Sequence, residues 1–378
     1  MSCYPHGKEP QCPTQLPGCE GIIRERSAKQ CGACARVNRP KPLLTVPAQV
    51  VADREKHRTK AELDGLRRRY QEALETIERL EQTIKSVEVL GDSLDTYHIE
   101  PVKGSGTSEG TVVAVASDWH IEERVGAEVG GLNTYSLDIA KARATKFFQS
   151  TLRLTNLLAQ DLHIERLVLA LLGDYITNDI HDAENAETNA LLPMQGIALA
   201  QSMLISGIEF LLKHSTLKLV VPCHSGNHAR TTQKTRFASE SGHSLEYLLY
   251  LHLAAYFRHE PRIQFVIPEG AHSYLQVYDQ TIRFQHGHMV KYQGGVGGIY
   301  IPVNKAISQW NKARHANLDV FGHFHQLRDG GNFICNGSLI GYNAFALSIK
   351  ADYEKPKQAL FLIDKKRGRT CTWPILVE

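Results

Sequence analysis

The chain has 378 residues and a formal net charge of only +3, from 43 Lys and Arg against 40 Asp and Glu. This charge excludes a polycation that binds nucleic acid over its whole surface, so any such binding must come from a local patch. The 42% of hydrophobic and 22% of charged residues are ordinary for a globular protein. No stretch approaches the roughly 18–20 apolar residues of a membrane span, and the N-terminus lacks a signal-peptide core, so we expect no membrane partner.

Residues 1–48 are predicted to be a small zinc-binding segment. Five of the eight cysteines lie in the first 34 residues, which indicates a local metal site in the reducing cytoplasm rather than a secreted disulfide framework. The thiols expected to hold a structural Zn²⁺ are Cys12, Cys19, Cys31 and Cys34. The wide spacing of the upstream pair keeps Cys3 and His6 as candidates, and the alternative is a tail with incidental thiols.

Residues 49–91 are predicted to form a coiled coil. Apolar side chains recur at strict three-four spacing, at Leu63, Leu66, Tyr70, Ala73, Ile77, Leu80, Ile84 and Val87. Charged residues flank this stripe over more than three heptads, which is typical of a coiled coil. The alternative is a single amphipathic helix on the following domain, but two positions in seven make a narrow stripe for that packing. We therefore expect a homo-oligomer, a dimer or higher, and a flexible linker over 92–110.

From residue 111 the pattern alternates between strands and helices, which predicts an α/β domain over 111–378. Short apolar runs predict strands at 111–116, 167–172, 217–222, 274–278, 281–285, 318–321, 332–336 and 358–363. Amphipathic segments predict helices near 136–160, 184–213, 239–258 and 301–314.

Metal-capable side chains follow five of these strands. In chain order they are Asp118 and His120, Asp174, Asn227 and His228, His286, and His323 and His325. A single histidine of this kind is more often structural than a ligand. Because ligands of α/β sheets gather at the carboxyl edge of the strands, five such groups in succession predict one metal site.

The order D-x-H, G-D, G-N-H, an isolated His and G-H-x-H resembles the calcineurin-like metallophosphoesterase superfamily. The resemblance covers about residues 111–378 and implies a four-layer α/β/β/α sandwich with a dinuclear metal centre. Residues 111–378 are similar in particular to phage-encoded DNA-repair exonuclease or phosphoesterase proteins. This similarity would place the chain in a bacterial or phage-infected cytoplasm.

The resemblance also implies a role for each residue. The first metal would be held by Asp118, His120 and His325, the second by Asn227, His286 and His323, with Asp174 bridging both. His228 would protonate the leaving oxygen or stabilise the transition state. Mn²⁺ is the metal most expected from this donor set, with Fe or Zn²⁺ as alternatives. Two such ions can bridge a hydroxide and clamp phosphate oxygens.

Several further features keep alternatives open. His288 could face the metal in place of His286, although the family pattern favours His286. Trp119 is expected to be a packing residue, and the polar run 178–182 a solvated loop. The basic loop after His228 offers Arg230, Lys234 and Arg236 for phosphate contact, with a solvated loop as the alternative. Ala229 stands where many family nucleases carry Asp or Glu.

The leading hypothesis is therefore a metal-dependent phosphodiesterase that acts as a nuclease on DNA or RNA. The alternative is a phosphatase or phosphodiesterase for phosphoproteins, nucleotides or small phosphoesters, since the same site would serve it. A third reading is an interaction scaffold with a decayed site, and the intact ligand set counts against it.

Overall fold

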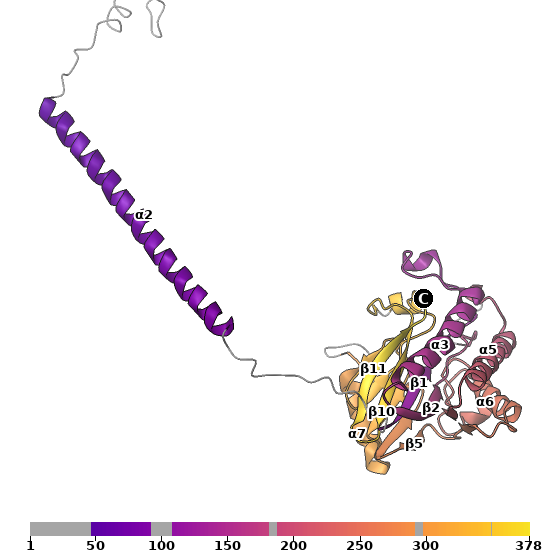
Figure 1. Cartoon of the computed structure of the whole chain (residues 1–378). Coiled ribbons are helices and arrows are strands. Elements are labelled where there is room, and N and C mark those ends of the chain that lie inside the picture. Colours follow the sequence, from indigo (N-terminus) through magenta and orange to yellow (C-terminus); the bar gives the residue numbers. More distant parts are fainter. Residues whose placement is uncertain (1–46, 92–107, 181–186, 292–297, 349) are drawn as a thin grey trace, which may run out of the picture. The chain divides into compact units, whose positions relative to one another are not determined.

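The computed structural model describes residues 47–91, 108–180, 187–291, 298–348 and 350–378 (Figure 1). The chain divides into two compact units, Met1–Glu100 and Pro101–Glu378, which are described separately. Cys12, Cys19, Cys31 and Cys34 lie outside the described residues, as does most of the 92–110 linker. The structural zinc site therefore stays a prediction.

The described part of the first unit is one long helix, α2 (Ala48–Gly91), of 44 residues. It covers the helical segment predicted over 49–91. Its apolar stripe is exposed in the single chain, with Leu66 63%, Tyr70 68% and Leu80 54% accessible to solvent. A helix this long with no core of its own depends on packing for stability.

Eleven strands in the described residues of the second unit form two mixed sheets. The six-stranded sheet has the order β11-β10-β1-β2-β3-β4, and the five-stranded sheet the order β5-β6-β7-β9-β8. The first sheet consists of β1 (Glu109–Ala116), β2 (His163–Leu171), β3 (Lys218–Pro222), β4 (Ile263–Val266), β10 (Lys357–Asp364) and β11 (Gly368–Leu376). The second consists of β5 (Ser273–Val277), β6 (Gln280–Phe284), β7 (Leu318–Phe321), β8 (Arg328–Asp329) and β9 (Phe333–Cys335). Strands β1 to β4 run parallel, and β10 and β11 close the edge in antiparallel pairing.

Helices cover both outer faces, which gives four layers (Figure 1). They are α3 (Leu137–Leu158), α5 (Pro193–His214), α6 (Leu245–Tyr256), α7 (Tyr300–Ala313) and the short α8 (Ala344–Ser348). Successive side chains of β1 point to opposite faces. Val112 and Ala114 join a core with α3, α5 and α6, whereas Val113 joins a core shared with the second sheet. A third core joins α7 to β7 and β9.

The apolar composition of helix α5 is explained by its packing. It is the one helix among the described residues that is long and apolar enough to cross a membrane, a length of apolar sequence that was not expected. Eight of its residues are buried, since it packs against both the first sheet and α3. A Cβ at Gly207 would lie 2.1 Å from the Phe148 ring of α3, so glycine is required there. A core helix buried in this way has the same composition as a span.

The remaining differences from prediction have local causes. The helix expected from 184 begins at Pro193, because a proline at the first helical position marks the start. The helix expected from 239 begins at Leu245, where the Ser244 side chain caps it. Strands β4, β8 and β11 were not predicted. The β11 sequence mixes polar with apolar residues, most of them only partly buried, so it has no continuous apolar run.

Candidate metal centre

Backbone hydrogen bonds hold the loops after β1 and β2 side by side. The amide of Asp118 donates to the Gly173 carbonyl at 2.9 Å, and the amide of Trp119 to the Asp174 carbonyl at 2.8 Å. Trp119 itself is fully buried against aromatic rings, as expected of a packing residue. The two loops thus continue the β1–β2 pairing past the ends of the strands and bring their carboxylates together.

The centre is built from unusual backbone conformations. Among the described residues, eight non-glycine residues have positive φ, and five of them are expected metal ligands. These five are Asp118 (56°), His120 (47°), Asp174 (53°), His323 (70°) and His325 (56°). Such conformations cost about 1–3 kcal/mol each and persist only where the surroundings enforce them, which is typical of functional sites. The side chains of all five belong to the overlapping groups of candidate ligands described below.

Two glycines of the motifs allow the loops to approach closely. A Cβ at Gly226, before Asn227, would lie 2.0 Å from Asp174 Oδ1. A Cβ at Gly322, before His323, would lie 2.2 Å from Asp118 Oδ2. The glycine of each motif is therefore required by the carboxylate of another loop.

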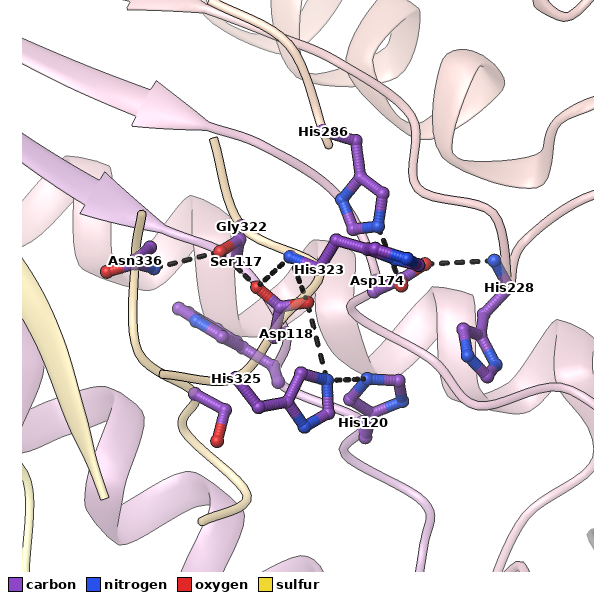
Figure 2. A network of polar contacts seen from close by, with 12 residues as sticks. Ser117, Asp118, His120, Asp174, His228, His286, Gly322, His323, His325 and Asn336 are labelled. Atoms are coloured by element: carbon purple, nitrogen blue, oxygen red, sulfur yellow. Dashed lines mark hydrogen bonds and ion pairs between the residues drawn. The ribbon is translucent and has the colours of Figure 1, made fainter. Parts of the chain in front are cut away.

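The expected first-metal residues, Asp118, His120 and His325, form one group whose candidate ligand atoms lie within 4.8 Å of one another (Figure 2). The Nε2 atoms of His120 and His325 are 3.2 Å apart, and His325 Nε2 is 3.5 Å from Asp118 Oδ1. All three residues are buried or nearly so.

Asp174, His286 and His323 form a second group of the same size. His286 Nε2 lies 2.9 Å from Asp174 Oδ2 (Figure 2). It also lies 3.2 Å from Asn227 Oδ1. Asp174 also belongs to a third group with His120 and His228, so it stands between the two halves of the centre. The structure brings together all seven residues predicted as ligands.

Hydrogen bonds set the histidine tautomers in a form that suits a metal. The Thr177 hydroxyl donates to Glu123 at 3.0 Å, so it accepts from His120 Nδ1, which lies 3.0 Å away. His286 Nδ1 is 2.6 Å from the Leu172 carbonyl, which can only accept. Because each Nδ1 donates its proton away from the centre, Nε2 is the nitrogen that each ring turns toward the centre, as in metal-bound histidines. Buried carboxylates, an amide oxygen and such imidazoles fit a pair of divalent transition-metal ions.

Strong electrostatic coupling accompanies this burial. Burial, and then the charge on His228, lower the pKa of His120 well below its usual value. Burial acts the same way on His286, but the Asp174 carboxylate outweighs it and raises the pKa of His286 to about 10. Burial alone would raise the pKa of Asp174, yet the charges of His286 and His228 lower it. A buried carboxylate here is stabilised by positive charge.

His228 lies beside these groups and makes two directed contacts. Its Nδ1 is 2.8 Å from the Thr177 carbonyl, and its backbone amide donates to Asp174 Oδ1 at 2.9 Å. Since Nδ1 must donate to the carbonyl, Nε2 is the ring nitrogen left to act on a substrate. The distances alone also allow coordination, since His228 shares a group with His120 and Asp174. His288 is in none of these groups, which agrees with the choice of His286.

The basic loop is held by hydrogen bonds between the Arg230 side chain and nearby backbone carbonyls. Arg230 donates to the carbonyls of Asn227, Thr232 and Gln233, so its guanidinium braces the turn after His228. Lys234 and Arg236 are exposed. Phosphate contact by these three residues stays a prediction.

The polar run 178–182 is only partly a solvated loop. Asn178 is buried and its amide donates to the carbonyls of His228 and Arg230, whereas Asp179 is exposed. His181 and Asp182 lie outside the described residues.

Comparisons with known proteins find only solved structures of low similarity to this chain. No family model matches the sequence, and no curated protein matches it. Among solved structures, a hypothetical protein from Pyrococcus horikoshii is 13% identical, covers 70% of this chain and 87% of its own, and has a TM-score of 0.35. Vps29 from Entamoeba histolytica complexed with Zn²⁺ is 13% identical, with 70% and 99% covered and a TM-score of 0.28.

A conserved protein from Streptococcus pneumoniae, described as a predicted phosphoesterase, is 12% identical, with 70% and 98% covered and a TM-score of 0.28. TM-scores of this size carry no conclusion about the function of this chain.

Glu246 is a site residue that the sequence reading missed. This fully buried carboxylate accepts the Tyr175 amide and the Gly226 amide, each at 2.7 Å. It therefore joins the residue after Asp174 to the residue before Asn227. Burial, and then the charge of Asp174, raise the pKa of Glu246 to about 8. The available signal was one glutamate inside the apolar run of α6.

Glu122 has a similar position on the other side. It is fully buried and accepts the amides of Thr177 and Asn178 at 2.7 and 2.8 Å. Burial raises the pKa of Glu122 to about 7. The two carboxylates together organise the loop after β2 by its backbone.

We expect Glu246→Gln to weaken Mn²⁺ binding about 10- to 100-fold, the usual effect of losing a residue that orients metal ligands. The glutamine NH₂ cannot accept the second backbone amide, so the Asp174 and Asn227 loops lose their common anchor. Isothermal titration with Mn²⁺ measures the effect, and Glu209→Gln on the exposed face of α5 is the matched control. Unchanged affinity in the Glu246 variant would show that this carboxylate does not position the ligands.

Proposed function

We propose that this chain is a dinuclear-metal phosphoesterase that hydrolyses phosphodiester bonds, and that its substrate is nucleic acid. The observation that carries the proposal is the convergence of side chains from five loops into three overlapping groups. His120 links the first-metal group to the third group, Asp174 links the second-metal group to the third, and Asn227 lies beside His286. Chance placement of the same residue types would scatter them over the surface. Convergence at the carboxyl edge of parallel strands is what a built active site requires.

The division of ligands follows the groups. Asp118, His120 and His325 would hold one ion, Asn227, His286 and His323 the other, and Asp174 would touch both. When bound, two divalent ions, for which Mn²⁺ is the first choice, supply Lewis acidity to the phosphate and an activated water at neutral pH. The protein contributes a dry, rigid frame: positive-φ backbone, interlocked glycines and tautomers set by Leu172 and Thr177.

His228 is proposed as the proton donor. The Thr177 carbonyl fixes the Nδ1 proton, so a second proton on Nε2 makes the ring cationic and able to protonate a leaving alkoxide. The hydrogen bond from the His228 backbone amide to Asp174 Oδ1 fixes the backbone of His228 beside the expected metal ligands. The same cation would favour negative charge that develops on the phosphate.

The nucleic-acid part of the proposal is supported by the surroundings of His228. Lys234 and Arg236 stand exposed on the loop that begins two residues after it. Lys and Arg side chains that follow a phosphodiester backbone supply most of the non-specific affinity for nucleic acid. We propose the cytoplasm of a bacterial or phage-infected cell as the setting.

Purified protein with Mn²⁺ should hydrolyse DNA or RNA oligonucleotides with a higher kcat/KM than cyclic nucleotides, a phosphopeptide or a small aryl phosphodiester. Binding to the polymer should weaken with added salt, because released counterions drive it. A preference for the phosphopeptide would favour the phosphatase alternative, and no hydrolysis of any member of the series would favour a scaffold.

Replacing His228 by Ala should lower kcat by about 10²- to 10⁴-fold while Mn²⁺ stoichiometry stays at the wild-type value. The loss should be larger for a nucleotide leaving group than for p-nitrophenolate, since a good leaving group needs less protonation. His259→Ala, at an exposed histidine beyond α6, is the control. Loss of a metal ion from the His228 variant would instead make His228 a ligand.

We also propose that α2 pairs with the α2 of a second copy. Its apolar stripe repeats at coiled-coil spacing and is about half exposed in one chain. Burying such a stripe along two helices is the usual way in which a helix of this length is stabilised. The proposal makes the protein a dimer or a higher homo-oligomer.

The double variant Leu66→Lys/Leu80→Lys in the full chain should sediment as a monomer, because it places charges inside the helix pair. Glu75→Lys, at a position outside the apolar stripe, should leave the oligomer intact. Analytical ultracentrifugation measures both, and a wild-type chain that sediments as a monomer would remove the coiled-coil proposal.

A further inference from the structure

Two phenylalanine rings stand exposed at the candidate metal centre. Phe237 is 53% and Phe345 56% accessible to solvent. Single exposed apolar residues are common and usually mean nothing. These two differ because each ring contacts a histidine ring of the centre or of its immediate border.

Phe237 belongs to the basic loop and stacks on His288. The ring centroids are 6.0 Å apart and the planes are inclined by only 13°. The His288 ring in turn lies 5.6 Å from His286 and 6.5 Å from His323, both of the second-metal group. One face of Phe237 is therefore covered by the border of the centre, and its exposed area is left for another group.

His288 makes this corner unusual. Its side chain is only 9% exposed, and neither ring nitrogen has a hydrogen-bond partner among the described residues. Its closest acidic neighbour is Glu240, with Nε2 to Oε1 at 3.5 Å. A buried polar ring without hydrogen bonds is costly unless a ligand or water completes it. Both His288 nitrogens are themselves buried, so His288 supports the Phe237 ring, and the exposed part of Phe237 is what this corner offers to a ligand.

Phe345 occupies the corresponding position at the other group. It lies on α8, and its ring centroid is 6.3 Å from that of His325, with planes inclined by 65°. His325 belongs to the first-metal group. One exposed phenylalanine thus lies near each of the two groups: Phe345 beside His325, and Phe237 beside His288, which neighbours His286 and His323.

The chemistry of this surface selects one class of ligand. Lys234 and Arg236 are exposed on the same loop as Phe237 and suit a polyanionic backbone. Aromatic rings beside such cations are the usual means of binding single-stranded nucleic acid, since every base has a face that can stack. In a duplex the neighbouring base pairs already cover those faces, so a stacking platform needs unpaired bases.

We propose that the substrate is single-stranded nucleic acid and that the bases on the two sides of the scissile phosphate stack on Phe237 and Phe345. The proposal rests on the proposed function of the metal centre. It assigns the two rings to the positioning of substrate, without a part in the chemistry. It also predicts little dependence on base sequence, because stacking reads no hydrogen-bonding pattern.

The test uses the full-length protein with Mn²⁺ and four variants: Phe237→Ala, Phe237→Leu, Phe237→Trp and Phe345→Ala. Each alanine variant should lower kcat/KM for a single-stranded oligonucleotide about 5- to 150-fold, mainly through KM, as expected for the loss of one stacked base. The leucine variant should behave like alanine, and the tryptophan variant should keep wild-type values. Hydrolysis of bis(p-nitrophenyl) phosphate should change by less than about twofold, which shows an intact centre.

An oligonucleotide with one abasic site beside the scissile phosphate provides the decisive comparison. The kcat/KM of the wild-type protein on this abasic substrate should fall about as much as the kcat/KM of an alanine variant falls on the unmodified oligonucleotide. The matching alanine variant should lose nothing further, because ring and base form one contact. Tyr256→Ala, an equally exposed aromatic at the far end of α6, should match the wild type on every substrate.

Two results would overturn the inference in distinguishable ways. If the wild type cleaves nucleic acid but cleaves duplex as fast as single strands, or if the alanine variants keep their kcat/KM, the stacking role is wrong and the proposed function survives. If the wild type prefers a phosphopeptide to every oligonucleotide, the proposed function is wrong and the stacking inference falls with it.

Discussion

The candidate centre depends on the backbone hydrogen bonds between the loops that leave β1 and β2. These bonds carry the Asp118 and Asp174 loops past the ends of the strands as a pair. Parallel pairing of β1 and β2 by itself would let the two loops diverge beyond the ends of the strands. Holding them together forces Asp118, His120 and Asp174 into left-handed backbone conformations, which the surrounding structure must stabilise.

That stabilisation comes from buried polar groups that touch backbone and not substrate. Glu246 and Glu122 accept four backbone amides between them, all from residues next to or near the ligands. Asp118 accepts the amide of His323 from the second sheet. Because an unpaired buried amide costs about 1–3 kcal/mol, each acceptor fixes the position of a loop as well as its stability. Ligands from two sheets thereby converge with little freedom to move.

The same concentration of charge explains why the centre suits metal ions and phosphate together. Buried carboxylates and imidazoles repel or neutralise one another unless a cation lies between them, and the opposite pKa shifts of His286 and His120 express that coupling. Around this polar centre the surface changes character. Phe237 and Phe345 add exposed aromatic faces to the border, and Lys234 and Arg236 add positive charge. These are the features on which the proposal of a single-stranded nucleic acid substrate rests.

The sequence by itself determined the α/β character, most strands and helices, and the seven residues that meet at the centre. It could do so because buried parallel strands are continuous apolar runs, and because sheet topology brings their carboxyl ends to one edge. Only the tertiary structure decided which carboxylates serve as anchors. Glu246 has no spacing relation to the residues it supports, and its role exists only because α6 meets the loops after β2 and β3. The contacts of Phe237 with His288 and of Phe345 with His325 likewise join residues far apart in the chain. Local patterns contain no record of such contacts.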